Sequence, residues 1–200
     1  MKQRHLYIFL LSCLMAIFLG ACASGKPEMR SGSILVNAND AIAVDPEVNR
    51  DFTAALSLLE DEEYDKAIEL LESIVKRENR VTAPFVNLGV AYMKVGKMDK
   101  AEENLLKAVK LDSGHPIANN ELGLLYRRTG RFSQAKSVYE KTLAMYPDLL
   151  PVRRNLAVLC DIYMDDLDCA LKNFQVLANE NPEDEQLKIW IAEIKARMGR

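Results

Sequence analysis

The side chains best suited to chemistry in this sequence are its four cysteines and two histidines. His5 lies close to the N-terminus, so His115 is the one imidazole in the rest of the chain. A Cys/His or Ser/His/Asp catalytic site needs an imidazole beside its nucleophile and would have to be built on His115. Because His115 precedes Pro116 in a predicted turn, the sequence favours no catalytic residue and indicates that the protein is not an enzyme.

The sequence lacks the common catalytic and ligand-binding motifs. It contains no Cys-x-x-Cys, His-Glu-x-x-His or Gly-x-Ser-x-Gly pattern and no glycine-rich phosphate loop. Acidic runs at 61–63, 165–168 and 180–185 fall at expected turns or helix starts and lack EF-hand spacing. We therefore expect no metal, no cofactor and no small-molecule substrate. The net charge of −3 gives no reason to expect a nucleic-acid partner.

The N-terminus has the pattern of a secretory signal. Lys2 and Arg4 precede an almost unbroken apolar run, Leu6–Leu19. A helix that crosses a membrane needs roughly 20 apolar residues, and this run is shorter. The sequence therefore predicts that residues 1–21 are a signal peptide.

The four residues Leu19-Gly20-Ala21-Cys22 directly follow this apolar run and resemble the bacterial lipobox. In that motif the signal peptide is cleaved before a cysteine that carries a diacylglyceryl thioether. The resemblance implies a covalent lipid on Cys22, with acyl chains such as palmitate that contribute about 0.8 kcal/mol per buried methylene. The alternative is an ordinary secreted protein in which Cys22 merely falls near the cleavage site.

The residue after this cysteine bears on the membrane that the lipid would enter. Inner-membrane lipoproteins of enteric bacteria usually have Asp at this position, whereas Ala23 occupies it here. The resemblance therefore implies a lipid anchor in the outer membrane of a Gram-negative cell, with the protein facing the periplasm. Residues 22–44 contain Ser, Gly, Pro and Asn without helical periodicity, so we expect a lipidated flexible tether.

One pattern occurs twice at an interval of 34 residues: Leu88-Gly89-x-x-Tyr92 followed by Ala101 recurs as Leu122-Gly123-x-x-Tyr126 followed by Ala135. Glycine in one helix and alanine in the next allow the two helices to pack closely. The pattern resembles the tetratricopeptide repeat, a unit of two helices. The resemblance implies an all-α fold, a tetratricopeptide-repeat α-solenoid of about four helix-turn-helix repeats with a C-terminal capping helix.

The 34-residue register sets the expected boundaries. Within 45–184 it predicts repeats at about 48–81, 82–115, 116–149 and 150–184, followed by a capping helix at 185–200. The fourth repeat departs from the register, because Ala170 lies 35 residues after Ala135. We expect the inserted residue to lie in the turn between the two helices of that repeat.

Cys160 and Cys169 both fall in the fourth repeat. Cys160 takes the position of Tyr92 and Tyr126, which faces the second helix, and Cys169 lies near the start of that helix. A short turn between antiparallel helices would bring them close, and in an oxidising periplasm a disulfide would stabilise the fold by about 2.5 kcal/mol. The alternative is two buried thiols that pack as small apolar groups.

In the tetratricopeptide family the first helix of each repeat lines a concave groove. The resemblance therefore assigns a peptide-binding groove to Val86, Val90, Met93, Asn120, Leu124, Arg127 and Arg154. A peptide could place apolar side chains on the valines and a carboxylate near Arg127 or Arg154, because guanidinium groups suit carboxylates. The alternative is that Val90 and Met93 pack between repeats and that the arginines are solvated or paired with nearby acids.

A lipobox, a tether and about four such repeats together resemble envelope lipoproteins of Gram-negative bacteria, which include pilotins of type IV pilus secretins and adaptors of cell-wall hydrolases. The resemblance implies an outer-membrane-anchored adaptor that binds a protein or peptide partner during assembly of an envelope complex, with pilus or secretin biogenesis as the leading case. A self-associating scaffold, whose repeats stack between copies, is the alternative.

Overall fold

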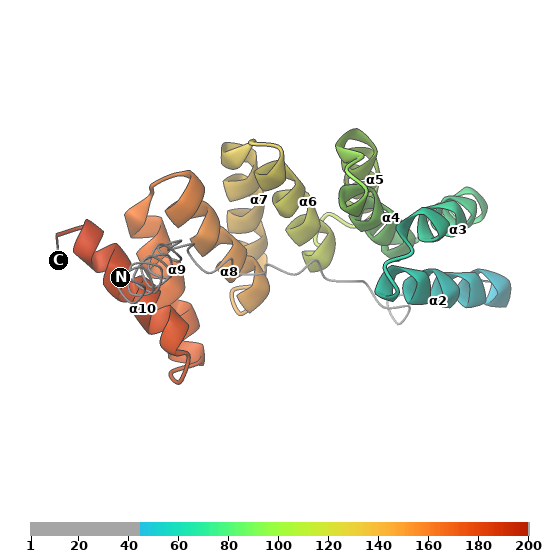
Figure 1. Cartoon of the computed structure of the whole chain (residues 1–200). Coiled ribbons are helices and arrows are strands. Elements are labelled where there is room, and N and C mark those ends of the chain that lie inside the picture. Colours follow the sequence, from blue (N-terminus) through green and yellow to red (C-terminus); the bar gives the residue numbers. More distant parts are fainter. Residues whose placement is uncertain (1–44, 200) are drawn as a thin grey trace, which may run out of the picture. The chain divides into compact units, whose positions relative to one another are not determined.

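The computed structural model describes residues 45–199, and all of the regular secondary structure in this range is helical (Figure 1). The all-α prediction is therefore confirmed. The expected signal peptide at residues 1–21, the lipid site at Cys22 and the tether at 22–44 lie outside the described residues. No helix within 45–199 is long and apolar enough to span a membrane.

The helices follow one another in pairs, and each helix packs on the next along the described part of the chain. The pairs are α2 (Pro46–Glu60) with α3 (Tyr64–Arg77), α4 (Thr82–Lys94) with α5 (Met98–Leu111), α6 (Pro116–Arg128) with α7 (Phe132–Met145), and α8 (Leu150–Val158), extended by η2 (Leu159–Tyr163), with α9 (Leu167–Glu180). A last helix, α10 (Glu185–Arg197), packs on α9. This arrangement is an α-solenoid of stacked helix pairs.

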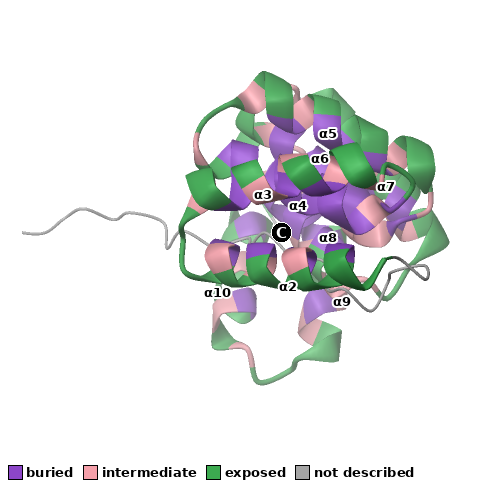
Figure 2. Ribbon diagram, turned by 90° about the vertical axis from the view of Figure 1, so that its right-hand side faces the viewer, coloured by how far each residue is buried: buried purple, intermediate pink, exposed green. Residues whose placement is uncertain are grey.

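Burial differs between the two helices of a pair. Helix α4 buries every residue from Ala83 to Met93, and α6 buries every residue from Ala118 to Tyr126. Helix α5 instead buries one face, and its other residues are half-buried or exposed. The buried residues gather between the helices in Figure 2. The first helices of the second and third pairs therefore form the core, while second helices such as α5 present a polar face.

Two glycines allow the helices of the second and third pairs to approach closely. A Cβ on Gly89 would lie 2.6 Å from Cγ of Leu105, and a Cβ on Gly123 would lie 2.3 Å from Cε1 of Tyr139. Leu105 and Tyr139 are fully buried and belong to the second helices of these pairs. The glycines of the repeated sequence pattern are thus required by side chains packed directly against them.

The turns inside the four pairs share one backbone conformation. The middle residue of each three-residue turn has a positive φ, at 60° for Glu62, 77° for Gly96, 75° for Gly130 and 52° for Asp165. The N–H of the last turn residue donates to a carbonyl near the end of the first helix, as from Lys97 to Tyr92 at 2.9 Å. This left-handed conformation reverses the chain at every repeat.

The residue inserted in the fourth repeat lies in the first helix, so its expected position in the turn was wrong. The turn there keeps three residues, 164–166, and the helix before it ends in the π-helical turn η2. The N–H of Asp166 donates to the carbonyl of Cys160 at 2.9 Å, which closes the turn as in the other pairs. A π-helical turn takes up one extra residue without breaking the helix, whereas an insertion in the turn would disturb the reversal.

Candidate functional site between helices α3 and α5

Five of the seven predicted groove residues are buried in the structure. Each of Val86, Val90, Met93, Asn120 and Leu124 is at most 3% exposed. They lie on α4 and α6, which neighbouring helices enclose. Their burial corresponds to the alternative of packing between repeats, so a partner cannot contact these side chains in this structure.

Asn120 has a clear structural role. Its Nδ2 donates to Oε1 of Glu121 at 3.0 Å, and its Oδ1 accepts from Nδ2 of Asn155 at 2.8 Å. All three side chains are buried, and Asn155 lies on α8. This buried polar contact therefore fixes α6 against α8.

The two predicted groove arginines are half-buried and both contact groups of the same chain. Nη2 of Arg154 lies 3.8 Å from Oδ2 of Asp184, at the start of α10. The guanidinium carbon of Arg127 lies 5.7 Å from the ring centroid of Tyr163. The Arg154 contact corresponds to the pairing with an acid that the sequence left as the alternative, and the Arg127 contact is a cation–π contact.

His115 has a local structural role. Its Nδ1 accepts a hydrogen bond from the N–H of Ala118 at 3.2 Å, so the imidazole caps the N-terminus of α6. The side chain is buried. The imidazole considered for catalysis is therefore used in starting a helix.

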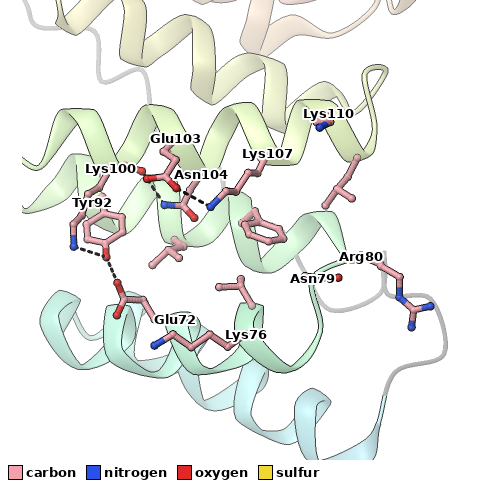
Figure 3. A pocket seen from close by; sticks show the side chains of 14 residues that line it. Glu72, Lys76, Asn79, Arg80, Tyr92, Lys100, Glu103, Asn104, Lys107 and Lys110 are labelled. Atoms are coloured by element: carbon pink, nitrogen blue, oxygen red, sulfur yellow. Dashed lines mark hydrogen bonds and ion pairs between the residues drawn. The ribbon is translucent and has the colours of Figure 1, made fainter.

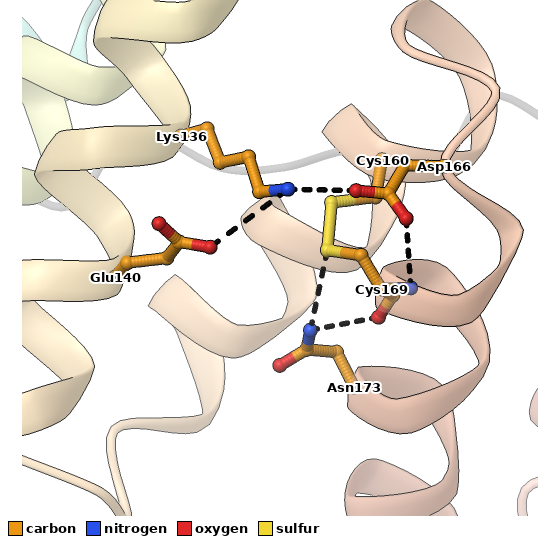
Figure 4. Close-up of polar contacts among 6 residues, drawn as sticks. All are labelled: Lys136, Glu140, Cys160, Asp166, Cys169 and Asn173. Atoms are coloured by element: carbon orange, nitrogen blue, oxygen red, sulfur yellow. Dashed lines mark hydrogen bonds and ion pairs between the residues drawn. A yellow bond between two sulfur atoms is a disulfide. The ribbon is translucent and has the colours of Figure 1, made fainter.

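The structure joins Cys160 and Cys169 by a disulfide (Figure 4), with the two Cα atoms 5.9 Å apart. Oδ1 of Asp166 caps α9 by accepting from the N–H of Cys169 at 3.1 Å, while its Oδ2 accepts from Nζ of Lys136 at 2.7 Å. The hydrogen bond from Lys136 lowers the pKa of the Asp166 carboxyl group. Helix α7 is thereby tied to the turn of the fourth pair.

This cluster could also be considered as a metal site, because two sulfurs and a carboxylate oxygen lie within 4.8 Å of one another. The sulfurs of Cys160 and Cys169 are bonded to each other, however, and only a thiolate binds a metal well. The arrangement therefore fits a structural cross-link better than a metal centre.

A cavity of about 780 Å³ lies between the second helices α3 and α5, with α4 beneath it (Figure 3). We call it the α3–α5 groove. Phe85, Leu88 and Tyr92 of α4 form its floor, and Leu111 of α5 adds an apolar side chain that is 42% exposed. Its charged lining residues are Glu72, Lys76, Arg80, Lys100, Glu103, Lys107 and Lys110.

A hydrogen-bond network crosses one end of the α3–α5 groove. The hydroxyl of Tyr92 donates to the carboxylate of Glu72, and Nζ of Lys100 donates to Oη of Tyr92 at 3.5 Å. Nζ of Lys100 also lies 5.1 Å from the Tyr92 ring centroid. Burial and the hydrogen bond to Glu72 raise the pKa of Tyr92 to about 12, so its hydroxyl stays protonated near neutral pH.

The other lysines that line the α3–α5 groove differ in their contacts. Nζ of Lys107 binds Oε1 of Glu103 at 2.8 Å and lies 6.0 Å from the ring centroid of Phe85. Lys76 and Lys110 are exposed, and neither has an ion-pair partner within residues 45–199. The groove thus combines an apolar floor with cations on both walls, an arrangement suited to binding rather than catalysis.

Sequence reasoning missed this groove because it assigned binding to the first helices of the repeats. Two signals were present. Lys100, Glu103, Lys107 and Lys110 follow one another at steps of three and four residues, which places them on one helical face. Lys76 and Lys110 are 34 residues apart and therefore occupy the same position in successive repeats.

Comparison with known proteins shows what the second and third helix pairs are similar to. Residues 80–148 match the family model for the tetratricopeptide repeat. The chain is 33% identical over 85 residues to the TPR repeat-containing protein MJ1428 of Methanocaldococcus jannaschii, which is 42% of this chain and 15% of that protein. It is 27% identical over 113 residues to Photosystem I assembly protein Ycf3 of Prochlorococcus marinus, which is 50% of this chain and 60% of that protein.

A solved structure supports the fold over a longer range. MamA from Desulfovibrio magneticus superposes with a TM-score of 0.69 and 18% identity, and the match covers 78% of this chain and 88% of that chain. At this identity the likeness concerns the fold alone. The two curated relatives are matched over less than two thirds of their lengths, so the activities of those whole proteins do not pass to this chain.

Proposed function

Because residues 80–148 match tetratricopeptide repeats and the described helices form an α-solenoid of that kind, we propose that this protein is a non-catalytic adaptor. It binds a protein partner and holds it during assembly of a larger complex. The observation that carries the proposal is the α3–α5 groove, where an apolar floor lies between walls with exposed lysines. The similarity to a protein named for the assembly of photosystem I supports a role of this class.

The proposal also places the adaptor at a membrane. Leu19-Gly20-Ala21-Cys22 follows a signal-like apolar run, and the proposed anchor is a covalent lipid on Cys22 in the outer membrane, with the repeats in the periplasm. The disulfide between Cys160 and Cys169 supports an oxidising compartment, because such bonds are rare in the cytosol. The proposed pathway is assembly of an envelope complex, with pilus or secretin biogenesis as the leading case and adaptors of cell-wall hydrolases as the alternative.

The anchor is tested with the Cys22→Ser variant. Labelled palmitate should enter the parent chain and not the variant, and the parent should fractionate with the outer membrane while the variant should not, because without the thioether its signal peptide is not removed. Intact mass of the parent should show the loss of residues 1–21 and the gain of acyl chains. A parent chain that incorporates no palmitate and keeps its N-terminus would contradict a lipid anchor.

The adaptor role is tested by photo-crosslinking in the cells that produce the protein. A crosslinking residue is placed at Lys76 or Lys110 in the groove, and at Lys141 or Lys172 on the second helices α7 and α9; all four positions are exposed. A defined partner should be captured from the groove positions. If no position captures any protein and light scattering shows a concentration-dependent oligomer, the self-associating scaffold replaces the adaptor.

A further inference from the structure

The groove between α3 and α5 has a charge opposite to that of the chain as a whole. Five cationic side chains line it against two carboxylates, whereas the full chain has a net charge of −3. A concentration of one sign of charge in a concave surface raises the local potential and attracts a ligand of the opposite charge. A ligand for this groove is therefore expected to be acidic.

Contacts within the groove show which charges a ligand would meet. Glu103 is bound to Lys107, and Glu72 accepts from the Tyr92 hydroxyl. Both carboxylates on the lining are thus already engaged. Lys76 on α3 and Lys110 on α5 have no ion-pair partner in the described part of the chain, so an extended segment lying between the two helices would meet an ammonium group on either side.

The floor of the groove requires an apolar group as well. Leu111 is 42% exposed at one wall, and Phe85 lies beneath the side chain of Lys107. Lysine side chains have flexible apolar stems and can move while keeping their charged end in water. A large apolar side chain could displace the Lys107 stem and pack on Leu111 and on Phe85, while Leu88, at 2% exposed, is buried in the floor. The volume of about 780 Å³ lies within the range of roughly 300–1,000 Å³ typical of binding pockets.

We infer that the α3–α5 groove binds an acidic segment of another protein, with a large apolar side chain of that segment against Leu111, which is 42% exposed, and Phe85 beneath Lys107. The inference rests on the proposed adaptor function and names the chemistry of its partner. The site lies between second helices, away from the buried residues of α4 and α6 that sequence reasoning had assigned to binding.

A second copy of this chain is a weaker candidate for the occupant. Its acidic segment 180–185 is mostly exposed, but Asp184 caps α10 and lies 3.8 Å from Arg154, and Glu185 binds Lys188 at 2.7 Å. The segment also has no large apolar side chain to place on the floor of the groove. A different protein that combines acidic and apolar side chains fits the groove better.

The probe for the test is a displayed library of random peptides selected against the full chain in detergent. Peptides enriched for Asp and Glu around an aromatic or large aliphatic residue are expected. Lys76→Glu with Lys110→Glu should weaken binding of those peptides by about tenfold or more, and raising the ionic strength should weaken it too. The matched control is Lys141→Glu with Lys172→Glu, which reverses two exposed lysines on other second helices and should leave binding unchanged.

The apolar contact is tested on one helix. Leu111→Ser should weaken binding of the selected peptides by about fivefold, since it removes exposed apolar surface at the groove. Leu106→Ser is the control, because Leu106 is 45% exposed on the same helix and does not line the groove. Circular dichroism should show that both variants remain folded.

Four outcomes would overturn the inference. The selected peptides could lack acidic residues, or the control variants could weaken them as much as the groove variants do. Light scattering could also reveal an oligomer that Lys76→Glu with Lys110→Glu dissociates, which would make a second copy the occupant. Capture of a partner at Lys141 or Lys172 and not at Lys76 or Lys110 would refute the groove while leaving the adaptor proposal standing.

Discussion

The third and fourth helix pairs are held together by different means. In the third pair Gly123 lets the Tyr139 ring pack against the backbone of the first helix, and a Cβ there would lie 2.3 Å from the ring. In the fourth pair the position 34 residues later is Ala157, and a disulfide from Cys160 joins the two helices instead. One pair depends on close packing and the other on a covalent bond.

The third and fourth pairs therefore share the conformation of the turn but differ in how their two helices contact each other. The π-helical turn η2 adds a residue to the first helix of the fourth pair, yet the turn after it keeps three residues with a positive φ in the middle. The disulfide and the contact of Lys136 with Asp166 then hold that turn in place. The fourth pair can therefore do without a glycine at the helix contact.

The largest effect is expected from Gly123→Ala. The added Cβ would lie under 3 Å from three atoms of the fully buried Tyr139 ring, which has little room to move, so we expect a loss of about 3 kcal/mol in the free energy of unfolding. Urea unfolding followed by circular dichroism measures it. Gly114→Ala is the control, because the nearest atom to its Cβ would lie at 3.4 Å. Equal stabilities for the two variants would refute the close-packing account of the third pair.

The next effect is expected from breaking the disulfide. Replacing Cys160 and Cys169 by Ser should lower the free energy of unfolding by about 2.5 kcal/mol, because the bond restricts a loop of roughly ten residues in the unfolded chain. The parent chain should gain the mass of two hydrogens on reduction and lose the same stability. No mass change on reduction would mean that the two thiols are free and that packing alone holds the fourth pair.

The fold could be predicted from the sequence because the evidence for it is local and periodic. Gly89, Gly123 and the alanines that follow them at a fixed distance specify a helix pair that is repeated, and the solenoid follows from stacking such pairs. The extra residue before Ala170 was also visible. Its location in η2 was not, because a helix and a turn can each take up one residue and only the packed structure decides between them.

The candidate site was less predictable, since it depends on distances between helices. Val86, Val90 and Met93 were assigned to a binding surface from their positions in the repeat, but neighbouring helices bury them. Lys76 and Lys110 line one groove only because α3 and α5 both pack on α4 and leave a cavity between them. The sequence contained their 34-residue spacing but did not show that a cavity lies between them.

Two buried tyrosines allow the contribution of a hydroxyl hydrogen bond to stability to be distinguished from that of ring packing. Tyr92 donates to Glu72, whereas the buried hydroxyl of Tyr139 has no hydrogen-bond partner among residues 45–199. Tyr92→Phe should therefore lower the free energy of unfolding by about 1 kcal/mol. Tyr139→Phe should leave it unchanged or raise it slightly, because the substitution removes an unsatisfied polar group. Thermal unfolding of the two variants measures the contrast. A larger loss for Tyr139→Phe would show that its hydroxyl is bound in solution.

The Tyr92 contact also predicts a dependence on pH. Its pKa of about 12 in the folded chain exceeds the value of about 10 expected in the unfolded chain, so the folded state holds the phenolic proton more tightly. The stability from this group is complete below pH 10 and is lost as the pH rises towards 12. Absorbance titration of the parent chain should show an ionisation near pH 12 that Tyr92→Phe lacks. An identical titration of both chains would refute the assignment.

The smallest effect concerns the turns that all pairs share. Glu62 adopts a φ of 60°, a conformation that glycine reaches without the steric cost of a Cβ. Glu62→Gly should therefore stabilise the first pair by about 0.5 kcal/mol, the relief of strain being partly offset by the greater freedom of glycine in the unfolded chain. Gly130→Ala makes the reverse change at a φ of 75° and should lower the free energy of unfolding by about 1 kcal/mol. Opposite signs for the two variants, measured by thermal unfolding, would show that the turn conformation is the same constraint in both pairs. A loss of stability in Glu62→Gly would instead mean that its carboxylate contributes more to the first pair than its backbone strain removes.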